Sequence, residues 1–147
     1  MDRTQQLVQH FLSHRNVTVE LIGKIEEENY NYKPTPTSMS TQELATHILT
    51  SFYQFASLAK KGEAKPLETN ETNLAKLADI YTEATQKLLE DMHDEDFDRV
   101  VEAMGAQMPA GQLLQIAMDH EINHKGNLFV YVRELGHTDL PMFVKRG

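Results

Sequence analysis

The sequence of 147 residues contains no cysteine. Disulfide bonds and thiolate ligands are therefore excluded, and any metal ion must be held by nitrogen and oxygen atoms. No apolar run approaches the roughly 20 residues that cross a bilayer, and the polar, amphipathic start of the chain lacks the apolar segment of a signal peptide. We therefore expect a cytoplasmic protein with no membrane partner.

Basic residues are few and scattered. Lys and Arg total 14 against 22 Asp and Glu, which gives a formal charge of −8. Because a phosphate backbone is bound by clustered positive charge, this composition argues against a nucleic-acid partner. The chain is 40% hydrophobic, as expected of a globular protein, and its length fits one domain over residues 1–147.

Four stretches carry apolar residues at helical spacing, with no convincing strand run between them. Pro34 and Pro36 exclude helix between the first two, and Ser40 and Glu43 form the capping-box pattern that starts the second. This pattern predicts an all-α four-helix bundle. The expected helices span about residues 2–28, 40–60, 70–93 and 109–135.

The segment between the third and fourth helices interrupts the helical pattern. Four acidic residues at positions 94, 95, 96 and 98 would be unfavourable at a helix C-terminus, so we expect a solvated turn there. It is not an EF-hand calcium loop, because the spacing and the glycine of that loop are missing. Residues 97–108 should be irregular or form a short strand pair around Gly105.

The fourth predicted helix contains the string H-E-I-N-H, whose two histidines are His120 and His124. Residues four apart lie on one helical face, so this pair suits a single metal ion. Their face also carries the apolar residues and should be buried. His47 holds a similar position on the second helix. Buried histidines are costly unless something binds them, and a divalent metal does so while leaving an open coordination position.

Each of these histidines can instead be a hydrogen-bonded core residue, which is the commoner role of a lone buried histidine. The three together favour a metal centre. The remaining histidines lie at expected helix ends or in loops and should be at the surface. They are His10, His14, His93 and His137.

The H-E-x-x-H string also matches the motif of zinc proteases. The third ligand of such enzymes is missing, because Val130 stands where one class has histidine, and Glu134 lies about 15 Å further along the same helix. No edge strand is expected to hold an extended peptide. The match therefore does not predict a protease. Glu121 remains either a candidate catalytic base beside the histidines or a solvated residue.

Two segments resemble motifs of the DinB/YfiT-like family, and the likeness spans most of the chain. One is the loop and helix start over residues 32–48, and the other is the string over residues 120–136. In the second segment, Lys125 and Asn127 replace the commoner Arg and Gln of the family pattern H-x-x-x-H-R-G-Q. Gly126 keeps the glycine, which costs a helix about 1 kcal/mol relative to alanine and would be explained by a close helix contact.

The resemblance implies a four-helix bundle, often dimeric, with a divalent metal held by three histidines, here His47, His120 and His124. We expect zinc or nickel at such a site. Some members resemble thiol S-transferases that use bacillithiol, mycothiol or glutathione. The resemblance therefore implies a metal-dependent transferase or hydrolase acting on a small molecule. The alternative is a metal-binding bundle with a non-catalytic binding or stress-response role.

Phe129 and Val130 lie on the fourth helix away from the histidines and need a covering partner. An exposed apolar strip commonly marks an interface, so we expect a homodimer. In the alternative, Met142, Phe143 and Val144 of the tail fold back over the strip within one chain.

Overall fold

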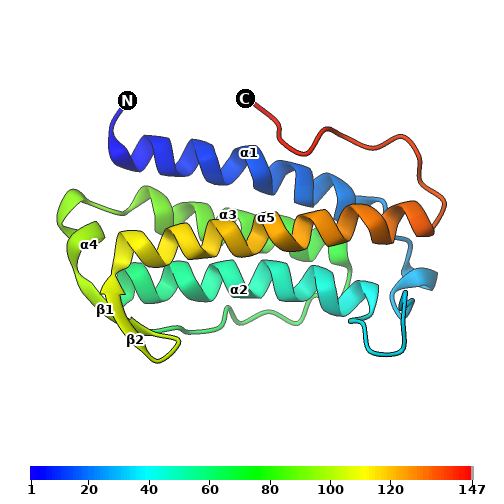
Figure 1. Ribbon diagram of the computed structural model, residues 1–147, viewed down its shortest axis with the longest axis horizontal. Helices are drawn as coiled ribbons and strands as arrows, with labels where there is room; N and C mark the ends of the chain where they lie inside the picture. The colour runs from blue at the N-terminus through cyan, green and yellow to red at the C-terminus, as the bar shows by residue number, and fades with distance from the viewer. Residues whose placement is uncertain (147) are drawn as a thin grey trace.

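The computed structural model describes residues 1–146 as a bundle of long helices with a small hairpin at one end (Figure 1). The all-α prediction is confirmed. Within these residues, no helix is both long and apolar enough to cross a membrane. In chain order the elements are α1 (Arg3–Gly23), η1 (Glu27–Asn29), α2 (Thr41–Lys61), α3 (Leu74–Glu90), α4 (Asp94–Asp98), β1 (Val100–Ala103), β2 (Ala106–Pro109) and α5 (Ala110–Glu134).

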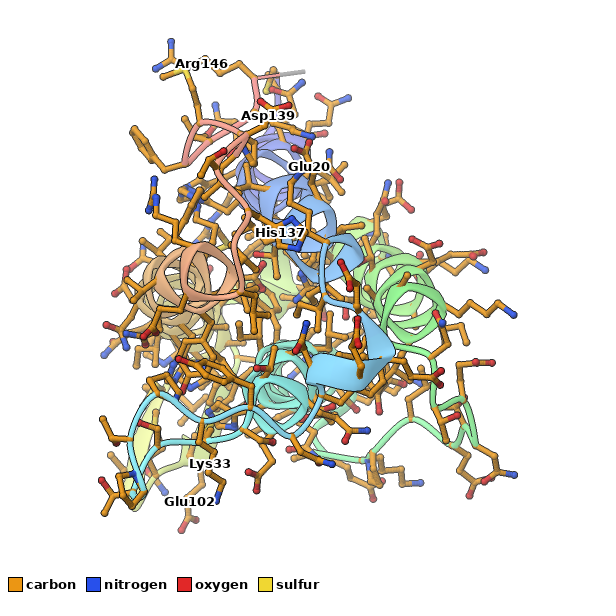
Figure 2. All side chains as sticks on the ribbon, turned by 90° about the vertical axis from the view of Figure 1, so that its right-hand side faces the viewer. Glu20, Lys33, Glu102, His137, Asp139 and Arg146 are labelled. Carbon is orange, nitrogen blue, oxygen red and sulfur yellow. The ribbon has the colours of Figure 1, made fainter. Side chains whose placement is uncertain are left out.

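The four long helices form a square in cross-section (Figure 2). Helices α3 and α5 each pack against both α1 and α2, so α1 and α2 face each other across the core. The rings of Phe11 and Phe52 bridge that diagonal, with centroids 4.8 Å apart. The α2–α5 side of the bundle carries all three candidate metal ligands. The tail after α5 returns along α1 and reaches the middle of that helix, where the Lys145 amide bonds to the Ser13 carbonyl (Figure 1).

The predicted start of the second helix is confirmed. The Ser40 hydroxyl accepts a hydrogen bond from the Glu43 amide at 3.1 Å, and the Glu43 carboxylate accepts one from the Ser40 amide at 2.8 Å. The helix ends at Gly62, whose φ of 79° is the left-handed conformation that closes many helices. This capping fixes the start of α2, and so the turn on which His47 stands.

The first helix is shorter than predicted, ending at Gly23 rather than near residue 28. Its last turn tightens, because the amides of Lys24 and Ile25 bond to carbonyls three residues back. Glycine is a weak helix former, and Ile25 then turns into the core. The periodic apolar pattern continued beyond Gly23 because the chain after the helix still packs on the bundle.

The acidic segment was wrongly predicted as a solvated turn. It is the short helix α4, and its Asp96 is buried. The Asp96 carboxylate accepts hydrogen bonds from the His93 amide (2.8 Å), Lys60 (3.0 Å) and Arg99 (2.9 Å). The amide and the two cations together hold its pKa well below the usual range. Acidic residues are favourable at a helix N-terminus, so the cluster starts a helix here rather than following one.

A two-stranded antiparallel sheet follows α4, which confirms the strand pair expected around Gly105. Its register pairs Val101 with Met108 and Ala103 with Ala106. The two turn residues, Met104 and Gly105, both have positive φ, as a tight two-residue hairpin requires.

Gly126 does not make the close helix contact expected for it. It is exposed, and within residues 1–146 no atom outside its chain neighbours and its own helix backbone lies within 4 Å of the place where a β-carbon would stand. Replacing Gly126 by alanine should therefore raise the free energy of unfolding by about 1 kcal/mol, because alanine favours the helix and meets no obstacle. Urea unfolding followed by circular dichroism measures this.

Gly111 on the same helix provides the matched control. A β-carbon there would stand 2.9 Å from Arg3 Nη2 and 3.3 Å from the Phe97 carbonyl oxygen. The free energy of unfolding of the Gly111→Ala variant should equal that of the wild type or be lower. Equal gains at both positions would show that helix propensity alone decides the effect.

Candidate metal centre

Three histidines from two helices meet between α2 and α5. Nε2 of His47 lies 3.0 Å from Nε2 of His120, and one ring nitrogen of each histidine, His124 included, lies within 4.8 Å of the others. Two nitrogens bound to one tetrahedral zinc ion stand roughly 3.4 Å apart. The three rings therefore fit a divalent ion with little movement. The 3.0 Å separation also permits an N–H···N hydrogen bond between His47 and His120.

The three rings pack edge to face, with centroids 4.5–4.9 Å apart. Two of them are oriented by a side chain one turn further along the helix. Ser51 Oγ lies 3.3 Å from His47 Nδ1, and Asn127 Oδ1 lies 3.3 Å from His124 Nδ1. Hydrogen bonds at Nδ1 leave Nε2 for an ion, which is how proteins commonly orient a ligating histidine.

The histidines lie at the edge of the core rather than inside it, and each is half-buried. Burial lowers the pKa of both His47 and His120, and the neighbouring histidines lower it further. Both rings are therefore neutral at pH 7. Neutral imidazole is the form that binds a metal ion.

The structure does not bring Glu121 to the histidines. Its carboxylate accepts hydrogen bonds from Arg15 Nε at 2.9 Å, from Arg15 Nη2 at 2.6 Å and from the Thr18 hydroxyl at 3.0 Å. The side chain is 1% exposed, so the alternative of a solvated residue is wrong. One residue along an α-helix turns by about 100°. His120 therefore faces α2 while Glu121 faces α1.

A second buried polar contact lies one turn further along α5. Lys125 Nζ donates to His14 Nδ1 at 2.6 Å and also to the Phe143 carbonyl of the tail. His14 is buried, so its predicted surface position was wrong. Burial, followed by the charge of Lys125, lowers the pKa of His14 to about 4. The neutral ring can then accept the bond from lysine.

The tail folds back, but it does not cover the apolar strip as the alternative proposed. The Lys145 amide donates to the Ser13 carbonyl at 2.8 Å, and its side chain pairs with Glu20 of α1. The side chains of Phe143 and Val130 stay 62% and 54% exposed. The tail is therefore held through its backbone and its charges.

Two clefts open beside the histidines, and Met39 lines both. The cleft on the His124 side measures about 360 Å³ and has mostly apolar walls. The cleft on the His47 side measures about 490 Å³ and is lined mainly by polar side chains. The first is lined by Pro34, Ser38, Met39, Leu44, His124, Asn127, Val130, Tyr131 and Glu134, and the second by Met39, Gln42, Glu43, Thr46, His47 and Thr50.

Comparison with known proteins places this arrangement in a family. The model of the DinB family matches residues 1–146. The uncharacterized protein YjoA of Bacillus subtilis (strain 168) is 52% identical, and the alignment covers 99% of both chains. The crystal structure of a DinB-like protein, YjoA from Bacillus subtilis, superposes with a TM-score of 0.90 at 55% identity, covering 97% of this chain and 99% of that one.

A more distant likeness concerns the fold. A DinB-like protein from Bacillus cereus ATCC 10987 superposes with a TM-score of 0.76 at 22% identity, covering 93% of this chain and 95% of that one. The family match over nearly the whole chain agrees with the helical architecture. The chain belongs to the DinB family.

Proposed function

We propose that this chain is a divalent-metal-dependent enzyme acting on a small molecule, as a transferase or hydrolase, with a low-molecular-weight thiol as cosubstrate. The observation that carries the proposal is the meeting of three half-buried imidazoles beside two open clefts. Zinc or nickel suits a set of nitrogen ligands. The thiol must come from the cosubstrate, because the chain has no cysteine.

The roles of the residues follow from their contacts. His47, His120 and His124 would hold the ion, and Ser51 and Asn127 orient two of the rings. When bound, the ion would lower the pKa of a thiol or a water molecule and so supply a nucleophile near neutral pH. The clefts on either side would receive the organic parts of the two reactants.

The position of Glu121 favours a second candidate function. Its carboxylate is bound to Arg15 and Thr18 in the core and is not free to act as a base. A site without that base suits a metal-binding bundle with a binding or stress-response role and no turnover. The burial of Glu121 also argues against proteolysis, because in zinc proteases the glutamate of this motif serves as the base.

A thiol-conjugation assay separates the two candidates. Zinc-loaded protein is mixed with monochlorobimane and single thiols, and the fluorescent conjugate is followed. We expect conjugation above the spontaneous rate that is lost when zinc is removed by a chelator. Stoichiometric zinc and ligand binding with no rate increase would support the non-catalytic role instead.

We also propose a homodimer. Ile122 and Val130 of α5 and Phe143 of the tail have exposed apolar side chains. Apolar surface of this kind commonly marks an interface. Light scattering at micromolar concentration should give a mass near twice the 16.8 kDa of one chain. A mass of about 17 kDa would refute the dimer.

A further inference from the structure

A groove runs between the first halves of α1 and α5, whereas the three histidines lie between α5 and α2. The two helices that form it point in the same direction (Figure 1). Each contributes residues three, four and seven positions apart, which lie on one helical face. The groove has a volume of about 430 Å³. Its lining consists of Arg3, Gln6, Leu7 and His10 of α1, Phe97 of α4, and Gly111, Leu114, Gln115, Met118 and Asp119 of α5.

The groove has an apolar floor and polar edges. Phe97, Leu114 and Met118 on the floor are buried, whereas Gln6 and Gln115 on the two edges are exposed. An apolar floor with a few polar groups around it is typical of a ligand site, and the volume lies in the range of such sites. A glutamine amide both donates and accepts hydrogen bonds, so a pair of them can bond to the N–H and C=O groups of a peptide.

One end of the groove carries a positive charge. The Arg3 guanidinium lies 4.2 Å from the centroid of the Phe97 ring, and a β-carbon on residue 111 would stand 2.9 Å from its Nη2 atom. Gly111 therefore leaves room for the guanidinium in the wall of the groove. Asp98 lies 3.8 Å from Arg3 Nη1, but the two side chains are 53% and 82% exposed, so water screens this ion pair. The other N–H groups of Arg3 can still bind a carboxylate.

The other end of the groove carries a negative charge. Asp119 is exposed and follows Gly111 by eight residues, or about 12 Å along the helix. His10 stands at the same end and offers a ring nitrogen rather than a fixed charge. Among the lining residues that the structure describes, Arg3 and Asp119 are therefore the two permanent charges. They have opposite signs and stand at opposite ends.

We propose that this groove binds a short apolar peptide of about three residues with both ends free. Its C-terminal carboxylate lies at Arg3, its N-terminal ammonium lies at Asp119, and its side chains pack on the apolar floor. An extended chain advances by about 3.3 Å per residue, so three residues span about 10 Å, which matches the separation of the two charges. The site uses neither a metal ion nor a thiol, so it is independent of the function proposed above.

The test compares three forms of one peptide by titration calorimetry. The forms are Leu-Ala-Leu with free ends, its N-acetyl derivative and its C-terminal amide. A salt concentration of about 0.15 M screens charges further apart than roughly 8 Å, so the net negative charge of the protein has little influence. We expect each blocked form to bind about fivefold more weakly than the free peptide. Arg3→Gln should abolish the effect of amidation and keep the effect of acetylation, and Asp119→Asn should do the reverse.

Two matched controls change the same residue types outside the groove. Arg133 of α5 and Asp79 of α3 are exposed and do not line it, so Arg133→Gln and Asp79→Asn should keep the wild-type order of the three peptides. Circular dichroism checks that all four variants are folded. The proposal is overturned if the free peptide shows no binding at about 1 mM, if the three forms bind equally, or if the control variants change the order as much as Arg3→Gln and Asp119→Asn do.

Discussion

Replacing Arg15 by alanine should lower the free energy of unfolding by about 3–5 kcal/mol, because it leaves the buried carboxylate of Glu121 without its partner. The two side chains are 0% and 1% exposed and are joined by three contacts of 2.6–3.1 Å. The guanidinium also stacks 4.7 Å from the centroid of the Phe11 ring, and that packing is lost as well. Urea unfolding of the wild type and the variant measures the difference.

Two control variants separate the buried charge from general damage. The double variant Arg15→Met, Glu121→Leu removes both charges and keeps most of the volume, so it should cost far less than Arg15→Ala. Lys87→Ala breaks an exposed ion pair with Glu83 and should cost at most about 1 kcal/mol. If Arg15→Ala costs no more than Lys87→Ala, the ion pair does not stabilise the core as described.

The double variant His120→Ala, His124→Ala should lose the bound metal. Untagged wild-type protein, equilibrated with zinc and dialysed, should hold close to one ion per chain, and the variant close to none, because one remaining histidine is a weak site. Elemental analysis by mass spectrometry measures the ratio of metal to protein. Circular dichroism should show the same helix content, since both side chains are only half-buried.

The matched control replaces two histidines outside the cluster. His10 and His93 are exposed and do not belong to the group of three. The variant His10→Ala, His93→Ala should keep one ion per chain. Equal metal content in both double variants would place the metal elsewhere on the chain.

Local signals predicted much of the fold and two of the three histidines of the candidate metal centre. The capping pair Ser40 and Glu43 placed the start of α2, and Pro109 and Gly136 bounded α5 to within a residue or two. Histidines four apart on a helix lie on one face whatever the rest of the chain does. His120 and His124 were therefore found together from their spacing alone.

The partners across the core were not predictable in the same way. Arg15 and Glu121 are 106 residues apart, and nothing in the local sequence shows that these two charges share one buried site. The contact between His14 and Lys125 was not predictable for the same reason, since these residues are 111 positions apart. A weak signal exists, because Glu121 and Lys125 are four apart on α5, and His14 and Arg15 are adjacent on α1. Charged residues at such spacing are common on solvated helices, so the pattern indicates a buried ion pair only once the burial of the residues is known.

Anomalous diffraction at the zinc edge, on crystals of untagged protein equilibrated with zinc, tests the metal centre most directly. The proposal predicts one strong peak about 2.1 Å from a ring nitrogen of each of His47, His120 and His124. A peak at another place, or no peak with His47 and His120 joined by a hydrogen bond, would contradict it.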